Sequence, residues 1–166
     1  DSCSLALKHL SQSLNRSQLQ QKYSQSVELS DDTVVYRWSD QPNGITDPIL
    51  SFWQTGKPNP GFVGKYLFRA TVGQLRELGD IRWDPYDLTN TVQSRALVLI
   101  LPHEATTPER LPGERTEPVI GWQGNLPIYR PDSPFYSPPE GMWTDLEGNR
   151  HFSDEPENDR FLERFQ

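Results

Sequence analysis

Residues 95–101 read Arg-Ala-Leu-Val-Leu-Ile-Leu and are followed by Pro102. A continuous apolar run of this length, closed by a proline, is typical of a strand that is buried on both faces at the centre of a sheet. We therefore expect the core of the fold to be built on this strand.

Shorter patterns on either side of this run predict further strands. β-branched and aromatic residues over Thr33–Trp38 and Phe62–Val72 favour extended structure. Turn residues separate two later pairs of short runs, which predicts two hairpins. The paired runs are Val119–Trp122 with Leu126–Arg130, and Met142–Thr144 with Arg150–Phe152.

Helical signals are strongest near the N-terminus. Leu7, Leu10 and Leu14 lie on one stripe at helical spacing, so we expect an amphipathic helix from Ser4 to about Tyr23. Three shorter helical segments are also predicted. They are a segment opened by Pro48 and running through Trp53, one turn capped by Thr71 and Gln74, and a terminal helix through Phe161, Leu162 and Phe165.

Together these elements predict an α+β fold, with the N-terminal amphipathic helix packed on a small, mostly antiparallel sheet and with long Pro-rich loops. At 166 residues the chain has the usual size of one domain, and we expect a single domain over 1–166. Within it we expect an N-terminal helical segment (1–30), a sheet core (33–130) and a Pro-rich acidic C-terminal segment (131–166).

Composition excludes several classes of function. The net charge is −7 and no basic stripe is present, which argues against binding to nucleic acid. No run approaches the roughly 20 apolar residues of a membrane-spanning helix. One cysteine cannot form an intrachain disulfide. Because the chain begins at Asp1 rather than Met, we expect a mature or excised domain that is secreted, periplasmic or extracellular.

Familiar catalytic and metal motifs are missing from the sequence. The three histidines and the single cysteine do not show the spacing of metal ligands, so we expect no metal. There is no nucleophile elbow, no phosphate-binding loop and no dinucleotide glycine fingerprint. His103, beside Glu104, has the chemistry of a general acid or base, but an exposed loop histidine is the alternative interpretation.

One local pattern has the chemistry of a pyrophosphate site. Val35-Tyr36-Arg37 lies on the first predicted strand, and an arginine beside aromatic residues can hold a pyrophosphate through its bidentate guanidinium. With the strand Lys65–Phe68 that follows, this part of the chain resembles the opening of ADP-ribosyltransferase toxin domains. The resemblance covers about a quarter of the chain and rests on short motifs.

The resemblance implies a toxin-like domain that acts on NAD by ADP-ribosyl transfer or NAD hydrolysis. By it, Arg37 with Tyr36 and Ser51 would bind NAD, and Glu117 or Glu114 would be the late catalytic glutamate. The family's Ser-Thr-Ser strand is missing, so Ser51 is a substitute. Ordinary alternatives exist, because the two glutamates could be a solvated charge cluster and Arg37 a structurally paired arginine.

A second class of function is a non-enzymatic module. Tryptophan, tyrosine and arginine anchor protein interfaces, and four tryptophans lie in or near predicted loops. They are Trp53, Trp83, Trp122 and Trp143, of which we expect two to belong to the core. The partner would be a target, an immunity protein or another subunit of a complex, docked through exposed Trp and Tyr side chains.

Overall fold

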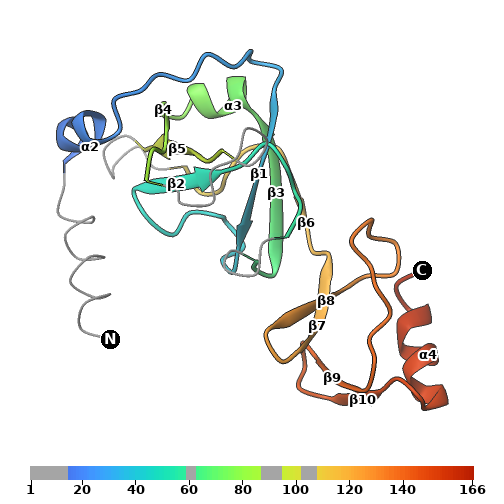
Figure 1. The fold of residues 1–166 in the computed structure, drawn as a ribbon. Helices are drawn as coiled ribbons and strands as arrows, with labels where there is room; N and C mark the ends of the chain where they lie inside the picture. The colour runs from blue at the N-terminus through green and yellow to red at the C-terminus, as the bar shows by residue number, and fades with distance from the viewer. Residues whose placement is uncertain (1–14, 59–62, 87–94, 102–107) are drawn as a thin grey trace, which may run out of the picture. The chain divides into compact units, whose positions relative to one another are not determined.

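The computed structural model describes residues 15–58, 63–86, 95–101 and 108–166 (Figure 1). These described residues form ten strands in three sheets, together with three short helices. The strands are β1 (Val34–Ser39), β2 (Ile49–Phe52), β3 (Tyr66–Thr71), β4 (Asp80–Trp83), β5 (Leu97–Ile100), β6 (Glu114–Thr116), β7 (Val119–Gln123), β8 (Leu126–Tyr129), β9 (Met142–Asp145) and β10 (Arg150–Phe152). The helices are α2 (Arg16–Lys22), α3 (Val72–Arg76) and α4 (Pro156–Glu163).

The predicted α+β class, with an N-terminal helix on one small sheet, is wrong. The described residues are mostly antiparallel β-structure in three sheets, and the helices have only seven, five and eight residues. Of the predicted N-terminal helix, only the last part is described, as α2, and the leucine stripe at residues 7, 10 and 14 lies outside the described residues. No described helix is long and apolar enough to cross a membrane.

The chain divides into two compact units. The first contains Asp1–Arg37, Gln41–Gly56 and Phe68–Glu114, and the second contains Trp38–Asp40, Lys57–Leu67 and Arg115–Gln166. One three-stranded sheet has the order β1-β3-β6. The prediction that the whole chain behaves as a single domain stays a prediction.

The first unit is built around the predicted central strand, which is confirmed as β5. All four β5 residues are at most 1% exposed, and the strand pairs antiparallel with β2 on one side and β4 on the other. Gly79, just before β4, makes this pairing possible, because a Cβ there would lie 2.2 Å from the Ile100 carbonyl oxygen. The predicted helix after Pro48 is wrong: these residues form β2, which completes the hydrogen bonding of β5.

Two short helices complete the first unit. Asn15 caps α2, and Leu19 and Tyr23 at its end pack on Val98 and Ile100 of β5. The predicted capping box of Thr71 and Gln74 is confirmed at the start of α3.

The second unit contains a four-stranded antiparallel sheet in the order β10-β9-β7-β8. Both predicted hairpins are confirmed, as β7 with β8 and β9 with β10. The register of β7 with β8 shifts between Val119 and Gly121, and the neighbouring residues Val119 and Ile120 pack in different core clusters, as expected for successive residues of a strand. Gly121 permits the contact between β7 and β9, because a Cβ there would lie 2.4 Å from the Thr144 carbonyl oxygen.

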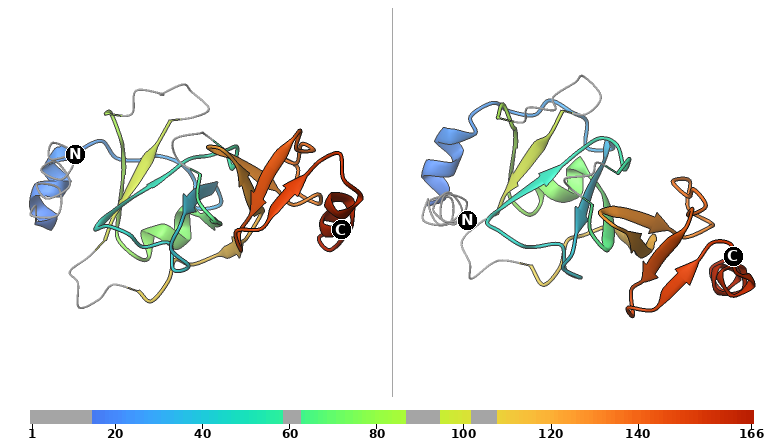
Figure 2. Two further views of the ribbon diagram at one scale, coloured as in Figure 1. Left: turned by 90° about the horizontal axis from the view of Figure 1, so that it is seen from below. Right: turned by 60° about the horizontal axis from the view of Figure 1, so that its bottom comes forward.

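Helix α4 covers one face of this sheet. Leu162, with Phe161 and Phe165, packs on Ile120, Ile128 and Trp143, which confirms the predicted terminal helix. In both views of Figure 2 the dark red α4 stands beside the red hairpin of β9 and β10. The opposite face has no helix among the described residues and is considered below.

Candidate functional site

Arg37, the predicted NAD ligand, is held by other parts of the first unit. Its Nε donates to the Gly44 carbonyl at 3.0 Å and one terminal nitrogen donates to the Thr46 hydroxyl at 2.8 Å. The other terminal nitrogen reaches the Ser51 carbonyl at 3.4 Å. Burial lowers the pKa of Arg37, and the nearby Asp47 carboxylate opposes that shift. The guanidinium thus ties β1 to β2 and to the turn that precedes β2.

Tyr36 and Ser51 form hydrogen bonds through their backbone groups. Tyr36 exchanges backbone hydrogen bonds with Trp53, at 2.7 and 2.9 Å. A Cβ on Gly56 would lie 3.1 Å from the Tyr36 ring, so the glycine packs closely against it. Ser51 is opposite Val98 in the sheet and meets Arg37 through its carbonyl group. The structure therefore joins Arg37 to the backbone of Ser51, whereas Tyr36, its neighbour on β1, directs its side chain to the other face of the strand.

The two predicted catalytic glutamates are not joined to that group. Glu114 begins β6, is exposed and lies 3.9 Å from the Arg69 guanidinium. Glu117 follows the same strand and is also exposed. Within the described part of the chain, no hydrogen bond or ion pair links either carboxylate to Arg37. Their catalytic role and the binding of NAD stay predictions, and His103 lies outside the described residues.

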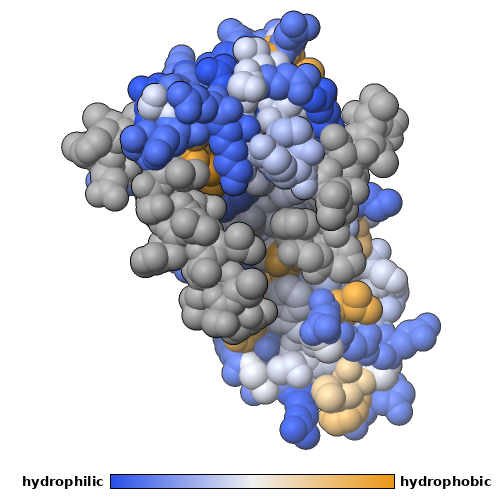
Figure 3. All heavy atoms as spheres, turned by 60° about the vertical axis from the view of Figure 1, so that its left-hand side comes forward, coloured by the Kyte–Doolittle hydropathy of each residue, from blue (hydrophilic) through white to orange (hydrophobic). Residues whose placement is uncertain are grey.

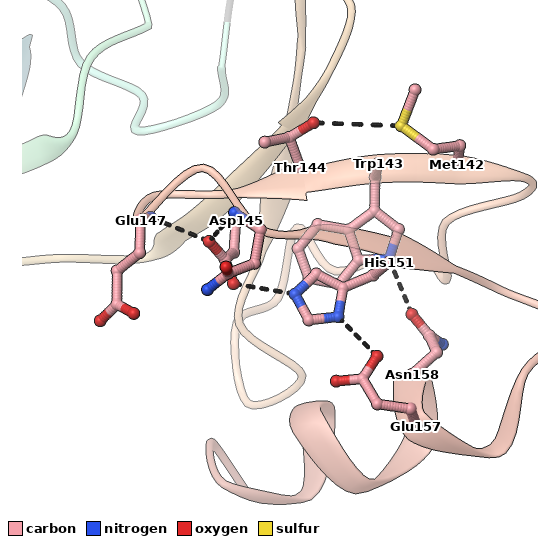
Figure 4. A network of polar contacts seen from close by, with 9 residues as sticks. Met142, Trp143, Thr144, Asp145, Glu147, His151, Glu157 and Asn158 are labelled. Atoms are coloured by element: carbon pink, nitrogen blue, oxygen red, sulfur yellow. Dashed lines mark hydrogen bonds and ion pairs between the residues drawn. The ribbon is translucent and has the colours of Figure 1, made fainter.

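Another group of titratable side chains lies in the second unit, around a histidine that the sequence patterns did not assign to a site. His151 of β10 stands between two carboxylates (Figure 4). Its Nε2 is 2.8 Å from Oδ2 of Asp145 at the end of β9, and its Nδ1 is 3.0 Å from Oε2 of Glu157 in α4. A carboxylate oxygen accepts, so each contact is a hydrogen bond from the ring nitrogen when that nitrogen carries the proton.

Asp145 is anchored on its other oxygen as well. Oδ1 accepts hydrogen bonds from the backbone N–H groups of Glu147 and Asn149, at 2.9 and 3.0 Å, within the tight hairpin turn. Burial alone would raise the pKa of Asp145, but the hydrogen bonds from His151, Asn149 and Glu147 outweigh it and lower the pKa. The carboxylate is therefore held in its charged form.

Aromatic rings close the group around His151. The Trp143 ring stacks on the imidazole with a centroid distance of 4.5 Å, and Phe161 approaches it at 4.2 Å. Trp143 also donates from Nε1 to Oδ1 of Asn158 in α4, at 2.7 Å. The His151 side chain is only 3% exposed, so a substrate could not reach its nitrogens. The arrangement joins the hairpin to α4 and does not form an open catalytic site.

A signal for this group was present in the sequence. The hairpin over Met142–Thr144 and Arg150–Phe152 is confirmed, and its register places His151 opposite Trp143. Asp145 follows the first strand, where a carboxylate often closes a turn. The position of Glu157 requires the packing of α4, which no local pattern reveals.

Exposed apolar side chains gather on the face of the second sheet that α4 leaves uncovered. Cross-strand neighbours share a face, and the register of the four strands gives a row across this side of the sheet. Met142 and Phe152, which lie opposite each other on β9 and β10, are 47% and 41% exposed. We call this side the open face, and it consists of Trp122, Pro127, Met142, Thr144, Arg150 and Phe152.

An apolar cavity of about 250 Å³ lies beside β8. It is lined by Pro58, Val63, Leu126, Pro127 and Tyr129, all within the second unit. Burial raises the pKa of Tyr129 to about 12, and its buried hydroxyl has no hydrogen-bond partner. The cavity is smaller than the roughly 300–1,000 Å³ typical of sites for drug-sized ligands, so its size suits one or two amino-acid side chains.

The four tryptophans divide as expected. Trp83 and Trp143 are buried core residues, which confirms that two of the four belong to the core, whereas Trp53 and Trp122 are half-buried. In the view of Figure 3 the surface is largely hydrophilic, with separate hydrophobic groups between the polar side chains. Among the described residues, no group of His, Cys, Asp and Glu side chains is arranged to hold a metal ion.

Comparison with known proteins leaves the family open, since no family model, no curated protein and no solved structure matches this chain.

Proposed function

We propose that this chain is a non-enzymatic interaction module that docks a protein partner through the open face of its second sheet. The observation that carries the proposal is the pair formed by Met142 and Phe152. The two side chains lie directly opposite each other, both are more than two-fifths exposed, and the antiparallel ladder of β9 and β10 fixes their positions.

The chemistry of the pair supports docking to protein. Single exposed apolar residues are ordinary, but adjacent ones on a rigid strand pair form a patch that gains free energy on burial, at about 25 cal/mol per Å² of apolar area. Aromatic residues and methionine are enriched at protein interfaces, and methionine adapts its shape to a partner. Trp122 lies on the same face but is half-buried and packs on the cluster of Trp38, Val119 and Tyr129, so the exposed apolar area is that of the Met142 and Phe152 pair.

The titratable groups favour this proposal over catalysis. The His151 imidazole is enclosed and both of its nitrogens are engaged. Three of the five N–H donors of Arg37 are used within the first unit, which leaves little of the guanidinium for a pyrophosphate. No observation on the described residues favours NAD chemistry specifically, and turnover of NAD by the purified chain remains its direct test.

Affinity capture from the native source tests the proposal. The wild-type chain is expected to retain a stoichiometric partner, and the double variant M142S/F152S is expected to lose it while keeping the wild-type melting curve. The matched control is Tyr86→Ser, which removes an apolar side chain of 58% exposure in the first unit and should retain the partner. A partner that binds M142S/F152S as tightly as the wild type would refute docking through the open face.

A further inference from the structure

Two carboxylates flank the Met142 and Phe152 pair. Glu140 lies two residues before Met142, and Asp154 lies two residues after Phe152. The intervening residues are tied together, because Ser153 N donates to the Gly141 carbonyl at 3.0 Å and Gly141 N donates to the Ser153 hydroxyl at 2.7 Å. The segments that carry Glu140 and Asp154 therefore run side by side at one end of the apolar pair.

Both carboxylates lie at the surface of the second unit. Both residues are exposed, and neither takes part in an ion pair among the described residues. The second unit as a whole carries eleven acidic and seven basic side chains, a net charge of −4. The negative potential at this end of the open face therefore persists in the folded chain.

We infer that the partner docks with a basic apolar segment, which places an apolar side chain on Met142 and Phe152 and a lysine or arginine against Glu140 and Asp154. This inference rests on the proposed function and adds the chemistry of the partner. A cation beside Phe152 would be attracted both by the two carboxylates and by the face of the exposed aromatic ring. Arg150, which lies directly opposite Thr144 on the same face, would repel the cation and restrict it to the Glu140 end of the patch.

Charge also discriminates against other occupants. A second copy of the chain would bring a unit of net charge −4 against one of the same sign. An anionic membrane surface attracts clusters of basic residues and would repel these carboxylates. A basic protein segment is the occupant whose charge complements the face.

The sequence offers a clean probe of this surface, because Met142 is the only methionine of the chain. Isotope labelling of the methionine methyl group gives one NMR resonance at the centre of the proposed contact. The probes are three short peptides that share the core Leu-Trp-Leu and differ only in the two residues before it, which are both Lys, both Ser or both Glu. Each peptide is titrated into the full chain at low ionic strength.

The Lys peptide is expected to shift the Met142 resonance at about one-tenth of the concentration that the Ser peptide needs, since two partly exposed ion pairs contribute modestly. The Glu peptide is expected to cause no shift. High salt should reduce the preference for Lys. In the double variant E140Q/D154N, the Lys and Ser peptides should bind equally.

The other outcomes are distinct. Equal binding of all three peptides would overturn the inferred charge selection and leave docking through the open face intact. A Met142 shift that depends on protein concentration alone would identify a second copy as the occupant and overturn the basic partner. A resonance that responds to none of the peptides would also overturn it, while partner capture by the wild type and M142S/F152S decides the proposed function separately.

Discussion

The sheet β2-β5-β4 of the first unit and the sheet β10-β9-β7-β8 of the second unit differ in how far their side chains are buried. In the first unit every residue of β5 is buried, so both faces of that strand are packed. In the second unit β9 alternates, with Trp143 and Asp145 buried and with Met142 exposed. A strand whose side chains are all enclosed contributes to stability alone, whereas an alternating strand leaves one face available to a partner. This difference is the basis for the proposal that the second sheet docks a partner.

In each unit one cationic or titratable side chain, Arg37 or His151, links separate elements through its hydrogen bonds. In the first unit the Arg37 cation is held by carbonyl and hydroxyl oxygens, and in the second His151 is held by two carboxylates. Each group joins elements distant in sequence, and each uses most of its hydrogen-bonding capacity. We therefore assign both groups a structural role, in which each fixes the elements of its own unit in place.

The largest expected effects are in the packed faces of both sheets. Leu99→Ala in β5 should lower the free energy of unfolding by about 3 kcal/mol and Trp143→Ala in β9 by about 4 kcal/mol, since both side chains are fully buried and each substitution leaves a cavity. Urea unfolding followed by circular dichroism measures both. A cost below about 1 kcal/mol at either position would show that its sheet tolerates loss of the packed face.

Particular residues show how far the sequence could predict this fold. The strand at β5 was predictable because an uninterrupted apolar run leaves no polar face, and the hairpins because turn residues separate their strands. The residues Ile49–Phe52 were predicted as helix from Pro48 alone, since four residues cannot distinguish the two periodicities. Their pairing with β5, far along the chain, determined the outcome.

The polar groups were harder to predict for a related reason. Arg37 was correctly placed on a strand, but its acceptors include the carbonyls of Gly44 and Ser51, and backbone acceptors leave no trace in residue type. The group at His151 depends on a hairpin register and on the packing of α4 together. Sequence patterns predict the hairpin, but they do not predict how α4 packs on it.

Arg37→Ala is expected to have the next largest effect. Loss of the guanidinium leaves the Gly44 and Ser51 carbonyls without their donor, which should cost about 2 kcal/mol of unfolding free energy. Urea unfolding of the variant measures this cost, and Arg69→Ala, at an exposed arginine of the same unit with a 3.9 Å ion pair, is the control. A urea unfolding curve equal to that of the wild type would contradict this structural role of Arg37.

Acid should affect the second unit through Asp145. Its pKa is lowered in the folded state, so the carboxylate stabilises the fold above its unfolded pKa of about 3.9, and this contribution is lost as pH falls through the folded pKa. Unfolding free energy measured from neutral to acidic pH should therefore decline below about pH 4, and Asp145→Asn should flatten that decline.

The matched comparison in the first unit is Asp80. Burial alone would raise the pKa of Asp80, but hydrogen bonds from Gln20 and Arg16 outweigh it and lower the pKa. Its side chain is 28% exposed against 3% for Asp145. Asp80→Asn should therefore flatten the acid decline less than Asp145→Asn does, because solvent screens the more exposed carboxylate. An equal or larger effect of Asp80→Asn would show that acid sensitivity is not concentrated at the His151 group.

The smallest expected effect on stability is on the open face itself. Met142→Ser and Phe152→Ser should each change the unfolding free energy by less than about 0.5 kcal/mol, because surface substitutions outside special features are nearly neutral. Trp143→Ala, one residue along the same strand, is the control that should be strongly destabilising. If Met142→Ser proved comparably costly, the open face would be covered within the folded chain and could not receive a partner. If the two substitutions leave the unfolding free energy unchanged and still abolish partner binding, Met142 and Phe152 must contact the partner directly.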